Sequence, residues 1–186
     1  MKLLILTASR FVLACLIAVS LAPALSVDAA ETGTAIDVFG KTMTVPAAFK
    51  EAPKQSRIIA HEFAASDGDD ATARVTMMAA GGGVKANLDR WKGQFSGDAK
   101  EIGEVENFDV AGFEVHLIEV SGNYAETMGG GPFSGGKKVM RENYGMMGAI
   151  IVDPRGPSYF VKMIGPSSVI EANESEFKTM IKSLSE

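Results

Sequence analysis

Cysteine is almost absent from this 186-residue sequence, which contains only Cys15. That residue lies in an apolar N-terminal segment that we expect to be removed, so the mature chain would contain no cysteine. A chain without cysteine cannot form disulfides, thiolate metal sites or a cysteine nucleophile. This absence is compatible with export, because a domain of this size can form an adequate hydrophobic core without disulfides.

The first thirty residues are predicted to be a signal peptide that is cleaved from the chain. Lys2 and Arg10 supply positive charge, Phe11–Leu25 is a mostly apolar run, and the small residues that follow are typical of a signal-peptidase site. The run is shorter than the about 20 apolar residues that a membrane helix needs. We therefore expect cleavage after Ala29 or Ala30, export to the periplasm or the medium, and no stable membrane anchor.

A lipid anchor at Cys15 is the alternative, because Val12–Cys15 loosely resembles a lipobox. Leu13 occupies the position two residues before the cysteine, where a small residue is usual, and the apolar run continues beyond the cysteine. Lipid anchoring also requires the acylated residue at a mature N-terminus. The sequence favours the cleaved signal peptide.

Charge of one sign does not dominate the chain. Lys and Arg number 18 against 23 Asp and Glu, and removal of Lys2, Arg10 and Asp28 leaves 16 − 22 = −6. A mildly acidic chain without a basic face does not resemble a nucleic-acid binder, and no polybasic stretch suggests adhesion to anionic lipid. The roughly 156 residues after cleavage, 31–186, are expected to form a single domain.

The mature chain is predicted to be mostly β-structure. Apolar and alternating runs bounded by turn residues predict strands at Ala35–Val38, Lys41–Val45, Arg57–Ala64, Ala73–Ala80, Glu104–Val110, Phe113–Ser121, Met146–Val152 and Tyr159–Ile164. Met146–Val152 is nearly continuously apolar, which indicates a central strand covered on both faces. Leu117-Ile118 interrupts the alternation of its strand, which predicts either a bulge or burial on both faces. Met128–Lys138 is rich in glycine and predicts a long mobile loop.

Two long helices are predicted. The first follows Gly81-Gly82-Gly83 and places four apolar residues on one stripe: Val84, Leu88, Trp91 and Phe95. The second closes the chain, with a capping box at Ser168 and Glu171 and an apolar stripe formed by Ile170, Phe177, Met180, Ile181 and Leu184. The predicted fold is therefore α+β, with a mostly antiparallel sheet of six or seven of these strands and at least one helix on each face of the sheet.

Two motifs and the order of the elements resemble those of a known superfold. The motifs are Trp91-Lys92-Gly93-Gln94-Phe95 in the first helix, and Tyr159-Phe160-Val161-Lys162 with Gly165-Pro166 before the last one. The chain from about Thr34 to Leu184 is similar to exported bacterial proteins of the PsbP/Mog1/DcrB-type α/β/α sandwich. The resemblance implies a role in binding or assembly, since PsbP-like proteins dock on photosystem complexes and Mog1-like proteins bind a small GTPase. None of their partner-binding residues can be matched here, so the resemblance implies no functional site.

The segment Gly131–Lys138 fits the G-x-x-x-x-G-K part of a phosphate-binding loop. The next residue after Lys137 is Lys138, so the hydroxyl that would hold magnesium is missing, and no helix is predicted to follow. Gly81-Gly82-Gly83 with Lys85 is a second possible anion cradle. The unusual backbone angles of a strand-to-helix break explain those glycines equally well, and we favour that interpretation.

The two histidines, His61 and His116, each have an acidic residue nearby, namely Glu62 and Glu114. Strand alternation places Glu114 and His116 on one face, which could serve a metal site or proton transfer. Two polar strand residues facing solvent explain the pattern equally well. No serine elbow is present, and the methionine pairs Met77-Met78 and Met146-Met147 are typical of core packing.

Three functional hypotheses remain. The preferred one is an exported, non-enzymatic domain without a cofactor that binds a partner protein or envelope component through its glycine-rich loop. The predicted contact residues are Gly129, Gly130, Gly131, Pro132, Phe133, Lys137 and Lys138. The alternative is a ligand-binding protein or hydrolase in which His61, His116 and Glu114 converge on a pocket between sheet and helix. The third is a purely structural envelope domain.

Overall fold

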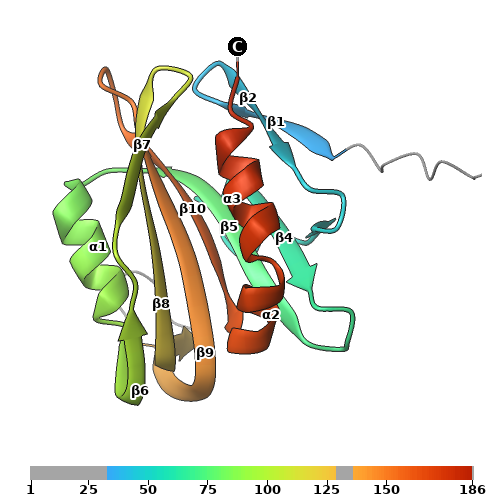
Figure 1. The fold of residues 1–186 in the computed structure, drawn as a ribbon, viewed down its shortest axis with the longest axis vertical. Coiled ribbons are helices and arrows are strands. Elements are labelled where there is room, and N and C mark those ends of the chain that lie inside the picture. The colour runs from blue at the N-terminus through green and yellow to red at the C-terminus, as the bar shows by residue number, and fades with distance from the viewer. Residues whose placement is uncertain (1–32, 129–135, 186) are drawn as a thin grey trace, which may run out of the picture. The chain divides into compact units, whose positions relative to one another are not determined.

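The computed structural model describes residues 33–128 and 136–185, which belong to the compact unit Glu31–Glu186 (Figure 1). The predicted signal peptide lies outside the described residues. Ten strands and three short helices make up the described part, and every strand pair in it is antiparallel. The α+β prediction with a mostly antiparallel sheet is confirmed.

Eight strands form the main sheet, in the order β3-β4-β5-β10-β9-β8-β6, with β7 also paired to β8. Their bounds are β3 Lys50–Glu51, β4 His61–Ser66, β5 Thr72–Ala80, β6 Phe95–Ile102, β7 Glu106–Val110, β8 Phe113–Met128, β9 Lys137–Val152 and β10 Ser158–Pro166. The central strand predicted at Met146–Val152 is part of β9 and is buried from Met146 to Ile151. Leu117 and Ile118 are both buried, in two different clusters, which confirms burial of β8 on both faces.

The sheet has two faces that differ in how they are covered. Val161 and Met163 of β10 point to one face, where they pack beneath helices α2 (Ser167–Ala172) and α3 (Glu174–Lys182). Phe160 of β10 points to the other face, which carries helix α1 (Val84–Lys92) and which we call the α1 face. A helix therefore lies on each side of the sheet, as predicted.

The hairpin β1 (Thr34–Val38) and β2 (Lys41–Val45) forms a separate two-stranded sheet. Phe39 and Gly40 at its turn both have positive φ, 54° and 80°, which is the geometry of a two-residue turn matched to strand twist. The inward residues of the hairpin add to the core beneath α2 and α3: Ile36, Val38, Met43 and Val45. This hairpin was predicted correctly.

The prediction of two long helices is wrong. The first helix ends at Lys92, and Phe95, which was assigned to its stripe, begins β6 instead. The C-terminal helix is divided at Asn173, whose side-chain Nδ2 donates to the carbonyls of Val169 at 2.8 Å and Ser66 at 2.9 Å. The buried stripe is nevertheless real, because it continues across the break: Ile170, Phe177, Met180, Ile181 and Leu184 are all buried.

The predicted capping box is absent. Helix α2 begins at Ser167 after Pro166 and has no side-chain cap. The Ser168 hydroxyl donates instead to Asp67 Oδ2 of the β4–β5 turn, at 3.3 Å.

The strand count of six or seven was too low. Strand β6 was missed because most of its side chains are polar and exposed, so Ser96–Glu101 shows no apolar alternation. The pair β8–β9 was also predicted too short. Both strands have 16 residues, and Met128 pairs with Lys137, so the ends of the predicted loop Met128–Lys138 are strand residues. The remainder of that loop, residues 129–135, lies outside the described residues.

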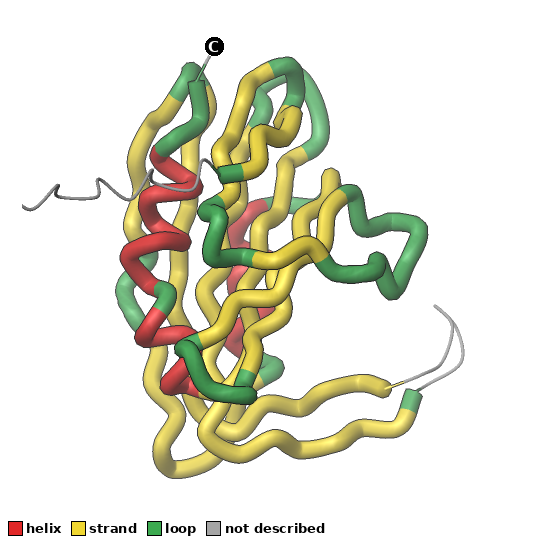
Figure 2. Tube along the Cα trace, turned by 90° about the vertical axis from the view of Figure 1, so that its right-hand side faces the viewer, coloured by secondary structure: helices red, strands yellow, loops and turns green. Residues whose placement is uncertain are grey.

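The distal part of the β8–β9 hairpin extends past the rest of the sheet as a two-stranded arm, residues 124–128 and 137–141 (Figure 2). A register shift between Gly122 and Tyr124 marks the base of this arm. Over the described ranges, 33–128 and 136–185, none of the helices is long and apolar enough to span a bilayer.

Candidate ligand cavity beneath helix α1

The two histidines lie far apart on the main sheet. His61 begins β4 and His116 is in β8, with β5, β10 and β9 between them. Neighbouring strands are about 4.8 Å apart, so four steps separate the histidines by about 19 Å. The prediction that His61, His116 and Glu114 converge on one pocket is therefore wrong. Among the residues that the structure describes, no three His, Cys, Asp or Glu side chains are grouped to hold a metal ion.

His116 and Glu114 do share one face of β8, as strand alternation predicted. His116 Nε2 lies 3.4 Å from Glu114 Oε1, and Nδ1 lies 2.7 Å from Asn107 Oδ1 of β7. The first contact lies within β8 and the second joins β8 to β7, and none of the three residues lines the cavity described below.

The predicted partner-contact residues are only partly described. Lys137 and Lys138 are the first two residues of β9 and both are exposed on the arm. Gly129, Gly130, Gly131, Pro132 and Phe133 lie outside the described residues. Contact through this segment therefore stays a prediction.

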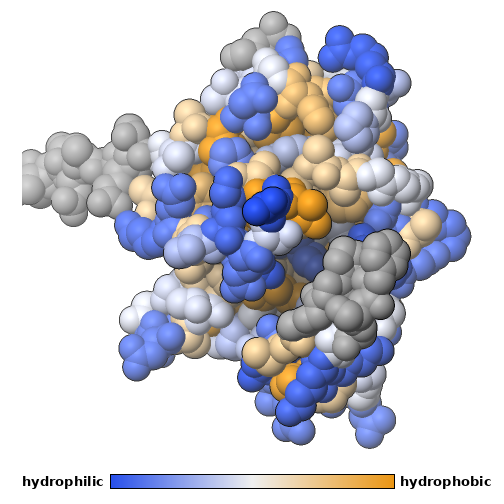
Figure 3. All heavy atoms as spheres, turned by 180° about the vertical axis from the view of Figure 1, so that it is seen from behind, coloured by the Kyte–Doolittle hydropathy of each residue, from blue (hydrophilic) through white to orange (hydrophobic). Residues whose placement is uncertain are grey.

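A cavity of about 390 Å³ opens on the α1 face, between helix α1 and strands β5 and β10. It is lined by Ile58, Thr76, Met78, Ala80, Gly81, Asn87, Arg90, Trp91, Gln94, Phe160 and Lys162. Figure 3 views the molecule from behind and shows a hollow in this side, where hydrophobic and hydrophilic residues lie next to each other. We call this space the α1 cavity.

Aromatic side chains form the floor of the α1 cavity. Trp91 and Phe160 are almost fully buried and meet edge to face, with ring centroids 5.4 Å apart. Trp91 can approach the sheet this closely because residue 148 is glycine: a Cβ there would lie 2.6 Å from Trp91 Cζ3. Ile58, which is 72% exposed, adds an apolar side chain at the mouth.

Two cations face the α1 cavity from opposite walls. Lys162 comes from β10 and Arg90 from α1. Arg90 Nη2 donates to Asn87 Oδ1 at 2.8 Å, while Asn87 Nδ2 donates to the carbonyl of Gly83 at 3.1 Å and that of Gly81 at 3.4 Å. Asn87 therefore joins the glycine turn to Arg90 and restricts where its guanidinium can lie.

Lys162 is half-buried, and its ammonium donates no hydrogen bond to any described residue. Burial, together with the positive charges of Arg90 and Arg74, lowers the pKa of Lys162 to about 8. Glu62, which is in register with Lys162 two strands away, is already engaged, because its Oε1 accepts from Arg74 Nε at 2.6 Å. Burial raises the pKa of Glu62, but the hydrogen bond and charge of Arg74 and the hydrogen bond from the Gln55 backbone together outweigh it, so the pKa lies below its ordinary value. The lysine is thus a charged donor without an acceptor in the described part of the chain.

Gln94 supplies a second unsatisfied polar group. Its Oε1 atom is buried and accepts no hydrogen bond from a described residue. The residue follows α1, and its backbone is fixed on both sides: its N–H donates to the Trp91 carbonyl at 3.1 Å and its carbonyl accepts from Ala125 at 2.9 Å. Buried polar atoms usually have partners, so an acceptor left unpaired in a cavity wall is consistent with a ligand site.

A second, more polar hollow lies beside the α1 cavity. It has a volume of about 480 Å³ and extends from the Glu62–Arg74 ion pair to the base of the arm, where Tyr124 and Tyr144 stack with ring centroids 6.1 Å apart. Its charges are internally paired, because Arg141 Nε also donates to Glu126 Oε2 at 2.8 Å. The α1 cavity differs in having cations without paired acids.

The lining of the α1 cavity was missed at the sequence level, although both of the motifs quoted for the superfold contribute to it. Trp91 and Gln94 come from the first motif, and Phe160 and Lys162 from the second. The available signal was Lys162 itself, because a charged residue in the apolar strand Tyr159–Ile164 requires a polar environment. Its partner Arg90 could not be identified without knowing that α1 lies across β10.

Comparison with known proteins adds information on the fold alone. The sequence matches no protein-family model and no curated protein. The structure is similar to the solution structure of cyanobacterial PsbP from Synechocystis sp. PCC 6803, at 12% identity and a TM-score of 0.47, over 88% of this chain and 97% of that one. At this identity no functional residue can be transferred.

Proposed function

We propose that this chain is an exported, non-enzymatic binding domain that takes a small molecule into the α1 cavity. The observation that supports it is the α1 cavity itself, which combines an apolar floor of Trp91 and Phe160 with polar groups that have no partner among the described residues. Small-molecule sites are typically concave, mostly apolar and equipped with a few convergent polar groups.

The composition of the lining favours binding over catalysis. General acid–base chemistry needs a titratable pair within hydrogen-bond reach, and nucleophilic catalysis needs an activated nucleophile beside a base. The described lining residues include no histidine, serine or carboxylate, and Lys162 has only other cations as charged neighbours. Export rests on the N-terminal sequence, in which a charged start, an apolar run and small residues precede the described domain.

Partner binding through the arm is a second candidate, favoured by one observation. Met128 and Met140 are about half exposed on the arm, at 49% and 51%, and adaptable methionine side chains are common at protein-binding surfaces. Lys137 and Lys138 add exposed charge beside them. Deletion of residues 129–136 is expected to remove such a partner without affecting a ligand in the α1 cavity.

Native mass spectrometry of the exported protein tests the first proposal. Protein purified without denaturation is expected to carry, or to bind from envelope extract, a small molecule in addition to its own mass. Ala80→Phe should abolish this, because Ala80 lines the α1 cavity at the end of β5 and the ring would fill the space. Ala79→Phe is the matched control, since Ala79 is the exposed neighbour whose side chain lies on the other face.

Loss of the bound molecule in both variants would show that the effect arises from general damage to β5. Retention of the molecule by Ala80→Phe would place its site elsewhere and refute the proposal.

A further inference from the structure

We propose that the ligand of the α1 cavity is a small amphiphilic anion whose anionic group lies between Lys162 and Arg90 and whose apolar part packs on Trp91 and Phe160. This inference rests on the proposed function, because it names the class of molecule that the same cavity would bind.

The charge of the lining selects against cations and neutral molecules. Lys162 and Arg90 are the charged residues among the described lining residues, and none of these is acidic. Among the residues that the structure describes, Arg90 donates only to the neutral amide of Asn87, and the nearby Arg74 is balanced by Glu62. Two positive charges therefore face one space without a counter-ion from the described part of the chain, and charged groups that leave water normally require a partner.

The donors suit a carboxylate, phosphate or sulfonate group. An ammonium and a guanidinium provide charge-assisted hydrogen bonds, and the free N–H groups of Arg90 form the planar fork that binds two oxygens at once. Asn87 Oδ1 holds Arg90 Nη2 at 2.8 Å on one side of this fork. Because the guanidinium is already restrained, less conformational entropy is lost when it binds a ligand. The Gln94 amide can add a further donor, since a half-turn of its side chain exchanges Oε1 for Nε2.

The remaining surface suits an apolar tail of limited length. Trp91, Phe160 and Met78 border the space, and Ile58 extends the apolar wall to the mouth. A water molecule occupies about 30 Å³ in the liquid, so about 390 Å³ accommodates about 13 non-hydrogen atoms. A medium-chain fatty acid or an aromatic acid falls within this size, whereas a long peptide or a two-chain lipid does not.

Three probes with the same tail test the inference: octanoate, octanol and octylamine. Isothermal titration of each into the purified protein at pH 7 should give the tightest binding for octanoate, by at least about tenfold over the other two, because only the anion pairs with both cations. Octyl phosphate should bind as octanoate does, which would assign the selectivity to negative charge in general.

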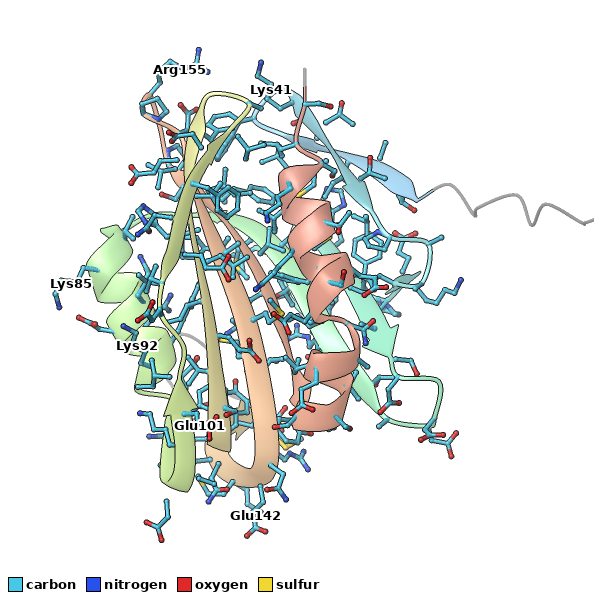
Figure 4. The ribbon with its side chains drawn as sticks, in the orientation of Figure 1. Lys41, Lys85, Lys92, Glu101, Glu142 and Arg155 are labelled. Carbon is cyan, nitrogen blue, oxygen red and sulfur yellow. The ribbon has the colours of Figure 1, made fainter. Side chains whose placement is uncertain are left out.

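Lys162→Met should lower the affinity for octanoate at least about tenfold and leave that for octanol nearly unchanged. Lys85→Met is the matched control, because it also replaces one lysine by methionine and removes one positive charge. Lys85 is in α1, points away from the sheet and has a side chain that is 90% exposed (Figure 4). Methionine retains the length and apolar character of the lysine stem, so the fold should be preserved, and a circular dichroism spectrum of each variant checks this.

Equal affinity for all three probes, or octanoate binding that survives Lys162→Met, would overturn the inference. A neutral molecule that co-purifies and is lost in Ala80→Phe would also overturn it while the proposed function stands. If no probe binds and no molecule co-purifies, both proposals are wrong.

Discussion

Replacing Lys162 with methionine should make the protein more stable at neutral pH. The lysine is half-buried on β10 between Phe160 and Ile164, its ammonium has no acceptor among the described residues, and Arg90 and Arg74 add repulsion. In the unfolded chain the same ammonium is fully hydrated. Folding therefore carries a free-energy cost for this charge, and methionine removes the charge while keeping a side chain of similar length.

The size of the effect follows from the pKa of Lys162, which falls from its ordinary value of 10.5 to about 8 in the folded protein. At about 1.4 kcal/mol per pH unit this difference corresponds to about 3 kcal/mol at pH 7. The side chain keeps some contact with water, which reduces the cost, so the expected gain for Lys162→Met is about 1–2 kcal/mol.

The gain should depend on pH in a defined direction. Because the folded pKa lies below the unfolded one, the unfolded chain binds more protons between about pH 8 and pH 10.5, and the wild-type protein becomes relatively more stable as pH rises through that window. The advantage of Lys162→Met should therefore be complete below about pH 8, decrease above it, and largely disappear above about pH 10.5.

Urea unfolding of both proteins at a series of pH values from 6 to 10.5 measures this difference directly, and taking the difference between variants cancels the titration of all other groups. A stability gain that is the same at every pH would show that packing, not charge, is responsible. A variant less stable than wild type at pH 7 would refute the account of Lys162 as an uncompensated cation.

Four further effects are expected. Gly148→Ala should destabilise the protein by about 1–3 kcal/mol in urea unfolding and alter Trp91 fluorescence, because the added Cβ would lie 2.6 Å from Trp91 Cζ3. Tyr159→Phe should stabilise the protein by about 1 kcal/mol, because the buried hydroxyl has no described partner and burial raises the pKa of Tyr159 to about 12; a loss of stability would reveal a missed partner. Burial and the nearby Glu174 raise the pKa of Glu119, so Glu119→Gln should stabilise at pH 7 and lose this advantage below about pH 4.5 in thermal unfolding. Octanoate affinity should fall between about pH 8 and pH 10 as Lys162 deprotonates, a dependence that titration of Lys162→Met should lack.

The sequence was most informative where local pattern and burial coincide. The hairpin at Phe39-Gly40 and the buried central strand at Met146–Val152 could be predicted because a turn residue or an apolar run specifies them directly. The helix lengths could not be predicted in this way, because an apolar residue such as Phe95 fits both the end of a helical stripe and the start of a strand. Strand β6 is defined by backbone pairing with β8, which leaves no pattern in its exposed side chains.

The candidate site was harder to predict because it depends on long-range packing. His61 and His116 attracted attention as rare titratable residues, yet strand order places three other strands between them. Lys162 and Arg90 are 72 residues apart in sequence, counted from their numbers, and nothing local links them. They meet across one cavity only because α1 packs over the sheet next to β10.

The α1 cavity itself follows from how a short helix covers a wide sheet. Helix α1 has nine residues, and its main anchor, Trp91, rests over Gly148 of β9. Helix α1 is too short to cover the neighbouring strands β10 and β5 fully on this face. Their side chains there include the polar Lys162 and Thr76 next to the apolar Phe160 and Met78. On the other face α2 and α3 cover a continuous apolar core. The face beneath α2 and α3 thus stabilises the fold, whereas Lys162 on the α1 face lowers its stability. A bound anion would supply the missing counter-charge and so remove the free-energy cost of burying Lys162.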